Sequence, residues 1–298
     1  MTQAETLEKI MSARQTASNG NKHPGTSGPS GPSPRVICIT SGKGGVGKTN
    51  ITTNLAFSLC KNGKKVMILD ADLNLANIDV LLGLTPKYNI NHVLAGEKTL
   101  AEVMITGPGG MMILPASSGI MELADLTEKQ KLYFMSEMET IDQAIDFLLI
   151  DTAAGINNNV VYFNLAAQER FIILSPEPTS LTDAYALIKV LSTRHDVKKF
   201  RILVNLAQSS KEALTVFRKL SSVADRFLDT ISLDYIGQIP LDNNLPLAVR
   251  RQKLVTELYP TSPASKTFFK LSEQLIEEEP ENLMDGNIKF LWKGMFDL

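Results

Sequence analysis

Seven short apolar segments alternate with helix-like segments between residues 36 and 240, and this alternation limits the possible folds more than any other feature. Segments such as VICIT (36–40), FLLIDTA (147–153) and RILVNLA (201–207) are apolar at nearly every position, as expected of strands buried on both faces. Strands that alternate with helices predict an α/β fold, a doubly wound and mostly parallel sheet with helices on both faces. Ligands of such folds bind at the carboxyl ends of the strands.

The bulk composition is typical of a soluble globular protein. A chain of 298 residues with 44% hydrophobic and 21% charged residues can bury a sizeable core. The net charge of −2 lacks the basic excess of nucleic-acid-binding proteins, so no direct nucleic-acid partner is expected. No apolar run approaches the roughly 20 residues that span a bilayer, and no secretory signal begins the chain. We therefore expect a cytoplasmic protein.

Composition changes along the chain predict four parts. Residues 1–17 have the spacing of a short amphipathic helix, and residues 18–34 form a Gly/Ser/Pro-rich linker that cannot bury apolar surface. Residues 35–276 contain the alternating strands and helices of one α/β domain. Residues 277–298 begin as an acidic connector and end in an amphipathic pattern.

The last twelve residues, NIKFLWKGMFDL, carry an apolar stripe at helical spacing. Lys289 and Lys293 flank this stripe. A stripe of large apolar residues beside lysines favours a helix that lies on an anionic membrane surface. Packing of the stripe onto its own domain is the alternative. The stripe consists of Ile288, Leu291, Trp292, Met295 and Phe296.

The segment GKGGVGKT, residues 42–49, has the Walker A spacing and lies between an apolar strand and a helix pattern. In such loops the backbone N–H groups surround a β-phosphate, and the helix N-terminus adds partial positive charge. Lys48 would neutralise the β- and γ-phosphate oxygens, and the Thr49 hydroxyl would bind Mg²⁺. The residues predicted to hold the nucleotide here are Gly44, Gly45, Val46, Gly47, Lys48, Thr49 and Asn50.

The same loop contains a second lysine, Lys43, which the phosphate cradle does not need. Its ammonium cannot easily turn back onto the phosphates that its own loop holds. This position favours a lysine that reaches across a face-to-face dimer and stabilises charge on the partner's nucleotide. A solvated surface lysine is the alternative.

Three aspartates follow two of the predicted strands. Asp70 and Asp72 end the segment LDAD, and Asp151 follows FLLI, where a Walker B carboxylate belongs. One carboxylate can hold the water shell of a metal while another orients the attacking water. Capping of the next helix is the alternative for Asp70 and Asp72. The small residues 153–155, AAG, would sense a γ-phosphate through their backbone.

Several of these motifs resemble those of a known family. The segment KGGVGKT resembles the deviant Walker A motif of the MinD/ParA class of dimerising ATPases. The segments at 69–84, 151–156 and 177–191 are similar to the MinD-like flagellar ATPases FlhG and FleN. The resemblance covers residues 35–275 and implies a P-loop NTPase fold. It also implies slow, dimer-dependent hydrolysis of ATP with Mg²⁺.

The resemblance also implies roles for single residues. It assigns the attacking water to Asp72 and the metal's surroundings to Asp70, whereas the strand-end position of Asp151 predicts a hydrogen bond to Thr49 or to a metal-bound water. It predicts that Asn54 contacts the nucleotide of the partner, and that Asn205 reads adenine through its amide donor and acceptor. An ordinary polar residue is the alternative for Asn54, and a plain strand-end turn is the alternative for the residues expected to pack on adenine, Pro240 and Leu241.

The implied function is control of flagellar number and placement. It would act by antagonising the AAA+ flagellar regulator (FleQ or FlrA) and through the GTPase FlhF, while bound to the cytoplasmic face of the inner membrane with ATP. The segment TQAETLEK matches the FlhF-stimulating helix at Gln3, Ala4 and Leu7 but departs from it at Thr2 and Glu8. A solvated or autoinhibitory helix is the alternative there. A division-site or chromosome-positioning ATPase and a nucleotide-dependent scaffold are the alternative functions.

Overall fold

The structure is a computed structural model. It describes residues 34–72, 77–115, 145–228 and 231–278, together with Tyr133, Ser136, Glu137 and Ile141. The predicted N-terminal helix, with Gln3, Ala4 and Leu7, and nearly all of the predicted linker lie outside the described residues. The same holds for the predicted membrane stripe at 288–296. The statements on these segments therefore stay predictions.

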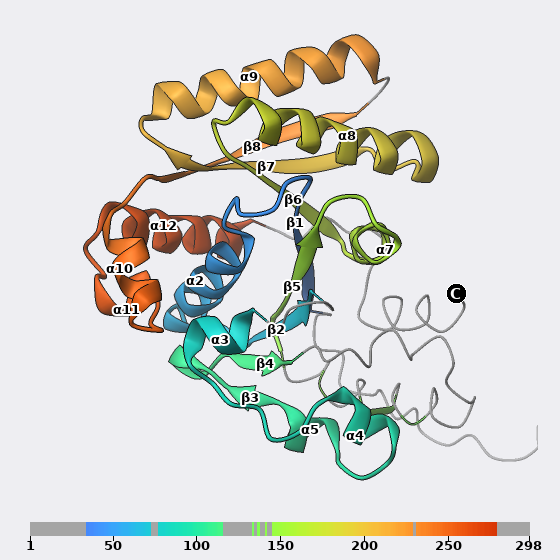
Figure 1. Ribbon diagram of the computed structural model, residues 1–298, viewed down its shortest axis with the longest axis vertical. Helices are drawn as coiled ribbons and strands as arrows, with labels where there is room; N and C mark the ends of the chain where they lie inside the picture. Colours follow the sequence, from blue (N-terminus) through green and yellow to red (C-terminus); the bar gives the residue numbers. More distant parts are fainter. Residues whose placement is uncertain are drawn as a thin grey trace, which may run out of the picture. The chain divides into compact units, whose positions relative to one another are not determined.

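The described part of the chain contains an eight-stranded sheet with the order β3-β4-β2-β5-β1-β6-β7-β8 (Figure 1). Neighbouring strands are parallel except for β3 and β4, which are antiparallel at one edge. The predicted doubly wound, mostly parallel α/β fold is thereby confirmed. The strands are β1 (Arg35–Ser41), β2 (Val66–Ala71), β3 (Ile105–Thr106), β4 (Met112–Leu114), β5 (Phe147–Ala154), β6 (Glu169–Leu174), β7 (Lys199–Ala207) and β8 (Ser232–Pro240).

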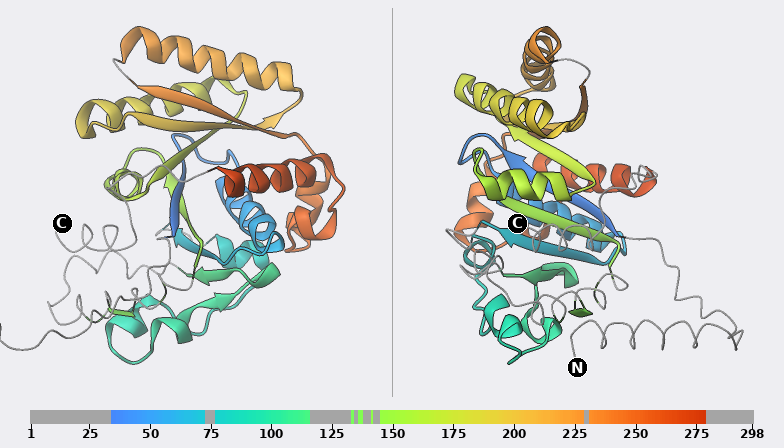
Figure 2. Two further views of the ribbon diagram at one scale, coloured as in Figure 1. Left: turned by 180° about the vertical axis from the view of Figure 1, so that it is seen from behind. Right: turned by 90° about the vertical axis from the view of Figure 1, so that its right-hand side faces the viewer.

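Helices cover both faces of this sheet (Figures 1 and 2). One face packs against α2 (Lys48–Lys61), α3 (Ile78–Leu82), α10 (Asn244–Arg250), α11 (Val255–Leu258) and α12 (Pro263–Glu277). The other packs against α4 (Ile90–Leu94), α5 (Leu100–Val103), α7 (Asn158–Ala166), α8 (Pro178–His195) and α9 (Ser210–Phe227). The turn η1 (Pro108–Gly110) precedes β4.

Strand β1 shows why its sequence is apolar at consecutive positions. Ile37 and Ile39 point into the core under α2 and α12, whereas Val36 and Cys38 point into the core on the opposite face. All four side chains are fully buried. Burying one such aliphatic side chain stabilises a fold by about 1.5–3 kcal/mol, so a strand at the centre of two helix layers tolerates polar residues only at its ends.

The sheet register brings the predicted carboxylates together. Asp70 of β2 is the register partner of Asp151 of β5, and Ser41 at the end of β1 pairs with Ala154. These strand ends surround the glycine-rich loop that joins β1 to α2.

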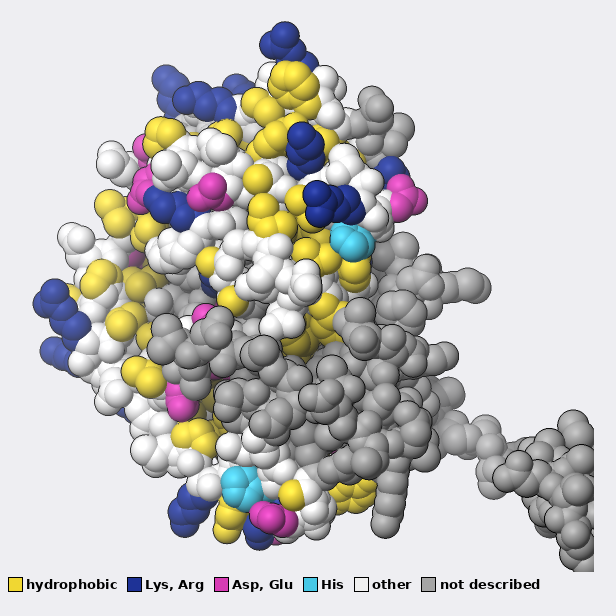
Figure 3. All heavy atoms as spheres, turned by 45° about the vertical axis from the view of Figure 1, so that its right-hand side comes forward, with side chains coloured by type: hydrophobic (Ala, Val, Ile, Leu, Met, Phe, Trp, Pro, Cys, Tyr) yellow, Lys and Arg dark blue, Asp and Glu magenta, His cyan; other side chains and the backbone are white. Residues whose placement is uncertain are grey.

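Figure 3 shows basic and hydrophobic side chains together on the face near α8 and α9. None of the described helices has an apolar stretch of the length that a bilayer requires.

Candidate nucleotide-binding site

The loop between β1 and α2 has a backbone that requires glycine at two positions. Gly45 has φ 77° and Gly47 has φ 91°, values that residues with a Cβ rarely adopt. A Cβ on Gly47 would also lie 2.4 Å from Nδ2 of Asn205. That amide donates to the carbonyl of Val46 over 2.7 Å, so the end of β7 holds the loop in place.

Lys48 begins α2 and points inward. Its side chain is only 8% exposed, and its Nζ donates to Oγ of Ser41 over 3.0 Å. Burial lowers the pKa of Lys48, while the charges of Asp151 and Asp72 oppose that shift. The Ser41 hydroxyl in turn donates to the carbonyl of Lys43 over 2.7 Å. The cradle therefore contains a buried cation beside two carboxylates.

Asp151, the predicted Walker B carboxylate, is almost fully buried. Its Oδ1 accepts a hydrogen bond from Oγ1 of Thr52 over 3.1 Å, but its Oδ2 has no hydrogen-bond partner among the residues that the structure describes. Burial raises the pKa of Asp151 to about 6, against the opposing effects of the Thr49 hydroxyl and the Lys48 charge. Buried carboxylate oxygens without a partner are rare and need an explanation, such as an absent ion or water.

Asp70 occupies the neighbouring strand end but has a different environment. Its carboxylate accepts from the backbone N–H groups of Asp72, Asn77 and Ile78 over 3.2, 3.2 and 3.3 Å. Burial and the nearby charge of Asp151 raise the pKa of Asp70 to about 7. The structure thus shows Asp70 as a cap for the start of α3, the alternative left open above, and gives its predicted metal role no direct support.

Asp72, one of the predicted catalytic residues, is more exposed than Asp70 and Asp151. It is half-buried, and its Oδ2 accepts from Nδ2 of Asn77 over 3.1 Å. It is close enough to Lys48 to affect the pKa of that lysine. Its position beside the cradle is compatible with orientation of a water.

Lys43 points away from the cradle and contacts α8. Its Nζ forms an ion pair with Glu177 and donates to Oγ1 of Thr179 over 2.8 Å. Both charged side chains are partly exposed, Lys43 to 32% and Glu177 to 60%. In this structure the second lysine of the loop is therefore held by its own chain, at the surface of the molecule.

Asn54, which is predicted to contact a partner's nucleotide, lies inside its own chain in this structure. Asn54 is 1% exposed, and its Oδ1 accepts from the backbone N–H and the hydroxyl of Thr256 over 3.1 and 2.9 Å. Its Nδ2 donates to the carbonyl of Asn50 over 2.8 Å. With all of these bonds made inside the core, Asn54 joins α2 to α11 instead of facing another chain.

The residues predicted near the adenine base are only partly brought together. Asn205 is buried against the loop through its bond to Val46, and its Oδ1 accepts from the N–H of Leu206. Pro240 ends β8 beside Ala207, and Leu241 is 55% exposed. Leu241 is therefore available to cover a base, but nothing in its contacts distinguishes this role from a strand-end turn.

Several residues of the site had no role in the sequence analysis: Ser41, Thr52, Asn77, Glu177 and Thr179. Thr52 stands one helical turn after Lys48, so its position on the inner face of α2 could have been inferred from helical spacing. Glu177 lies in the family-specific segment at 177–191. Its contact with Lys43 depends on how α8 packs beside the loop, for which the sequence carries no local signal.

The donor set fits a nucleotide with Mg²⁺. The Oδ2 of Asp151, which has no partner in the described part of the chain, and the neighbouring Thr49 hydroxyl are oxygen ligands of the kind that Mg²⁺ uses. Among the described residues, no cluster of three or more His, Cys, Asp or Glu side chains could hold a metal alone. An ion here would take its remaining ligands from phosphate oxygens and water, as is usual for Mg²⁺.

Comparison with known proteins agrees with this geometry. The family model ParA, described as NUBPL iron-transfer P-loop NTPase, matches residues 33–276. The antiactivator FleN of Pseudomonas aeruginosa is 47% identical over 241 residues, which cover 81% of this chain and 86% of FleN. The chain belongs to the FleN/FlhG group of MinD-like P-loop NTPases. The predicted family is confirmed, and with it the prediction that the chain is an ATP hydrolase.

Other members of this MinD-like family are also similar. The flagellum site-determining protein YlxH of Helicobacter pylori is 34% identical over 82% of this chain and 82% of YlxH. The MinC:MinD cell division complex of Aquifex aeolicus aligns with a TM-score of 0.63 and 29% identity, over 82% of this chain and 97% of that chain. MinD of Pyrococcus horikoshii complexed with Mg-ADP has a TM-score of 0.62 at 24% identity, which shows the shared fold.

Proposed function

We propose that this MinD-like ATPase binds ATP with Mg²⁺, dimerises around two nucleotides and thereby controls flagellar number and placement. The observation that carries the nucleotide-driven dimer is the position of Lys43, outside its own cradle and in a partly exposed ion pair at the surface. The flagellar role is supported by similarity to FleN and to YlxH, whose names describe an antiactivator and a flagellum site-determining protein.

In this proposal the residues of the cradle divide the chemistry of hydrolysis. Lys48 neutralises phosphate charge, and its burial strengthens that interaction because water screens it less. Thr49 and Asp151 hold Mg²⁺, which when bound would neutralise the charge that develops on the β- and γ-phosphates. Asp72 orients the attacking water, and the N–H of Gly155, which donates to the Ser41 carbonyl over 3.0 Å, belongs to the segment that senses the γ-phosphate.

Lys43 exchanges its partners when two chains meet. An exposed ion pair such as that between Lys43 and Glu177 contributes only about 0–1 kcal/mol, so ATP phosphates of a second chain can compete for the lysine. Each site then lacks one positive charge until the dimer forms. Slow hydrolysis by the monomer follows, and the nucleotide acts as a timer for the dimer.

The remaining partners are also proposals. The dimer would antagonise the flagellar regulator FleQ or FlrA, stimulate FlhF through the segment around Gln3, Ala4 and Leu7, and attach to the inner membrane through the C-terminal stripe at 288–296. One surface that we propose for the regulator is the stretch Asp183 to Lys189 on α8, where Asp183 is half-buried and Lys189 is exposed.

A division-site role is less favoured, because the septum site-determining protein MinD of Synechocystis is 33% identical, against 47% for FleN.

The dimer is tested by measuring molecular mass in solution with ADP and then with ATP. An Asp72→Ala background prevents ATP from being consumed, and we expect a monomer with ADP and a dimer with ATP. Adding Lys43→Ala should return the ATP sample to a monomer. A dimer that forms equally well without Lys43 would remove the central element of the proposal.

The membrane role is tested separately by sedimentation with vesicles that contain anionic lipid. Binding should require ATP and should be lost when Trp292→Glu interrupts the predicted stripe, since two weak helices bind together far better than one. The matched control is Lys266→Glu, an exposed position on α12. Equal binding by the Trp292→Glu variant and the wild type would exclude the stripe as the anchor.

A further inference from the structure

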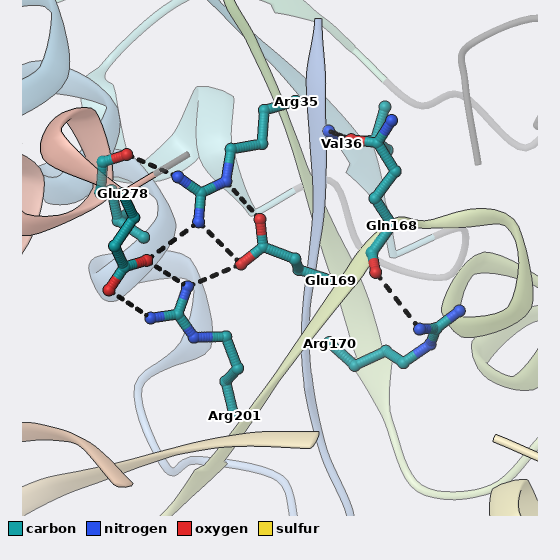
Figure 4. A network of polar contacts seen from close by, with 8 residues as sticks. Arg35, Val36, Gln168, Glu169, Arg170, Arg201 and Glu278 are labelled. Atoms are coloured by element: carbon teal, nitrogen blue, oxygen red, sulfur yellow. Dashed lines mark hydrogen bonds and ion pairs between the residues drawn. The ribbon is translucent and has the colours of Figure 1, made fainter. Parts of the chain in front are cut away.

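A four-residue ion network occupies the edge of the sheet opposite the nucleotide site (Figure 4). Arg35 begins β1, Glu169 begins β6, Arg201 lies near the start of β7, and Glu278 directly follows α12. The strands are parallel, so these amino ends lie at the edge away from the glycine-rich loop. We call these four residues the arginine clamp.

The two carboxylates of the arginine clamp differ in their surroundings. Glu169 is 13% exposed, pairs with Arg35 and accepts from Nη1 of Arg201 over 2.7 Å. It therefore holds both guanidinium groups in a fixed arrangement. Glu278 is 42% exposed and comes from the extended residue that ends α12. Of the two carboxylates, Glu278 is the one that can leave without disturbing a strand.

Glu278 binds the arginine pair as an external anion would. Its Oε1 accepts from Nη2 of Arg201 over 2.9 Å, and its Oε2 lies 2.8 Å from Nη1 of Arg201 and 3.1 Å from Nη2 of Arg35. Burial opposes ionisation of Glu278, but the hydrogen bonds and charges of Arg201 and Arg35 outweigh it and lower the pKa of that carboxyl. Forked contacts of this kind are how arginines recognise carboxylates and phosphates.

The space around the arginine clamp is large enough for a small ligand. A cavity of about 480 Å³ is lined by both clamp arginines, Glu169 and Glu278, and also by Lys199, Arg170 and Asp234. The cavity lining thus has four basic residues against three acidic ones, and four against two if Glu278 is displaced. Arg170 donates to the carbonyls of Asn164 and Ala167 at the end of α7. Of the arginines that line the cavity, Arg35 and Arg201 are therefore the two that hold the carboxylate of Glu278.

We propose that Arg35 and Arg201 form a binding site for a phosphate group, and that the carboxylate of Glu278 from the same chain occupies this site in the structure. A phosphate carries more negative charge than a carboxylate, and with Glu278 displaced the cavity lining has four basic residues against two acidic ones, an excess of positive charge that suits a phosphate. The phosphate comes either from solution or from a lipid headgroup. The site does not depend on the proposed dimer or on its membrane attachment.

Phosphate binding at this site would act on the end of α12. Arg35 donates through Nη1 to the carbonyl of Leu275 in the last turn of α12, so the same guanidinium holds both the helix end and Glu278. A phosphate that takes over the contacts of Glu278 therefore leaves the end of α12 with only one of its two bonds to Arg35. The consequence is a link between anion binding and the position of that helix end.

The test measures binding of inorganic phosphate by calorimetry, using the full chain with Mg-ADP bound so that the glycine-rich loop is filled. Ionic strength is held constant with chloride. Removing the internal competitor by Glu278→Ala should tighten phosphate binding by about tenfold, because apparent affinity scales with the fraction of open sites. The matched control is Glu277→Ala, which removes one carboxylate from the preceding, exposed position and should bind as the wild type does.

A second substitution separates a binding site from a purely structural network. Arg201→Gln, added to Glu278→Ala, should abolish the gained affinity, and Arg201→Lys should restore part of it; circular dichroism confirms that each variant is folded. Equal phosphate affinity of the Glu278→Ala and Glu277→Ala variants would overturn the proposal. That result would leave the ATP-dependent dimer untouched, because the dimer is measured by mass with ATP.

The source of the phosphate is distinguished with vesicles. Protein with Mg-ADP is sedimented with phosphatidylglycerol vesicles and with phosphatidylcholine vesicles. If lipid headgroups are the source, Glu278→Ala increases binding to phosphatidylglycerol several-fold over the Glu277→Ala variant. If free phosphate is the source, the calorimetric difference appears alone and vesicle binding of the two variants is the same.

Discussion

Charged side chains are paired differently at the two edges of the sheet, where the carboxyl ends and the amino ends of the parallel strands lie. At the carboxyl edge, one buried oxygen of Asp151 has no partner among the described residues. Burial lowers the pKa of Lys48 and raises the pKa of Asp151, so both shifts favour the neutral forms. At the amino edge, the guanidinium groups of Arg35 and Arg201 are bonded to Glu169 and Glu278. A buried charge without a partner costs stability, and removing one member of a buried pair creates such a charge. The unpartnered oxygen of Asp151 among the described residues therefore agrees with a nucleotide and metal site at the carboxyl edge.

The largest effect is expected at the amino edge. Arg35→Ala would leave the carboxylate of Glu169 nearly buried with one arginine instead of two, and loss of one partner from a buried pair costs about 3–5 kcal/mol. Urea unfolding measures this loss of free energy. Lys198→Ala is the control, because its pair with Asp196 is exposed and should contribute less than about 1 kcal/mol. Equal losses in the two variants would remove the contrast between the edges.

At the carboxyl edge the effect should appear in catalysis instead of stability. Asp151→Asn removes the proposed metal-binding charge and should reduce phosphate release by about 10²-fold or more, the usual result of losing one electrostatic group at a transition state. The melting temperature of the nucleotide-free protein should stay the same or rise, because a buried carboxylate no longer has to be ionised. A strong fall in melting temperature would mean that Asp151 is structural.

An intermediate effect is expected at Asp242, a nearly buried carboxylate that holds the start of α12. It accepts from the N–H groups of Ala264 and Asn244 over 3.0 and 2.9 Å. Burial opposes ionisation, but these hydrogen bonds outweigh it and lower the pKa of Asp242. Asp242→Ala should therefore cost about 1–3 kcal/mol of unfolding free energy at pH 7.

The pH dependence of that loss follows from the direction of the shift. A carboxyl whose pKa is lower in the folded state stabilises the protein above the pKa of the unfolded chain, about 3.9, and loses this effect as pH falls through the folded value. The difference between wild type and Asp242→Ala in urea unfolding should thus shrink between pH 5 and pH 3, roughly the range around those values. A difference that is constant with pH would show that charge does not matter at this position.

The smallest effect on stability is expected for Glu177→Ala. The partner of Lys43 is 60% exposed, and an exposed pair contributes about 0–1 kcal/mol. The variant should unfold almost as the wild type does, while its freed Lys43 should lower the ATP concentration needed for dimerisation. Mass measurements across an ATP titration give that concentration. A marked loss of stability would place Glu177 among the structural charges of the other edge.

Local patterns in the sequence predicted most of the fold and the centre of the site. Most strands could be recognised because their central positions are apolar, although β8 contains Asp234 and Gln238 and the two-residue β3 was not predicted. The phosphate loop could be recognised because its glycines, Lys48 and Thr49 are adjacent in the chain. Asp151 could be assigned because it directly follows the four apolar residues that begin β5, all of them buried. In each case the deciding interactions involve neighbouring residues or a single strand end.

The features that were missed depend on distant parts of the chain. Asn54 bonds to Thr256, which is 202 positions away, and Arg35 bonds to Glu278 across 243 positions. Asp70 caps α3 because the chain turns back after β2, and the two alternatives for this residue could not be separated by spacing alone. Such contacts follow from how helices pack on the finished sheet, and a single sequence carries no direct signal for them.

Gly42 shows how closely the phosphate loop and α8 are joined. A Cβ at this position would lie 2.1 Å from the backbone carbonyl oxygen of Asp183, so bare backbone of the loop rests on bare backbone of the helix. Two such surfaces have no flexible side chain between them to absorb a displacement. A movement of the loop toward α8 would therefore displace the helix itself. A molecule bound to the outer side of α8 could in this way respond to the nucleotide without contacting it.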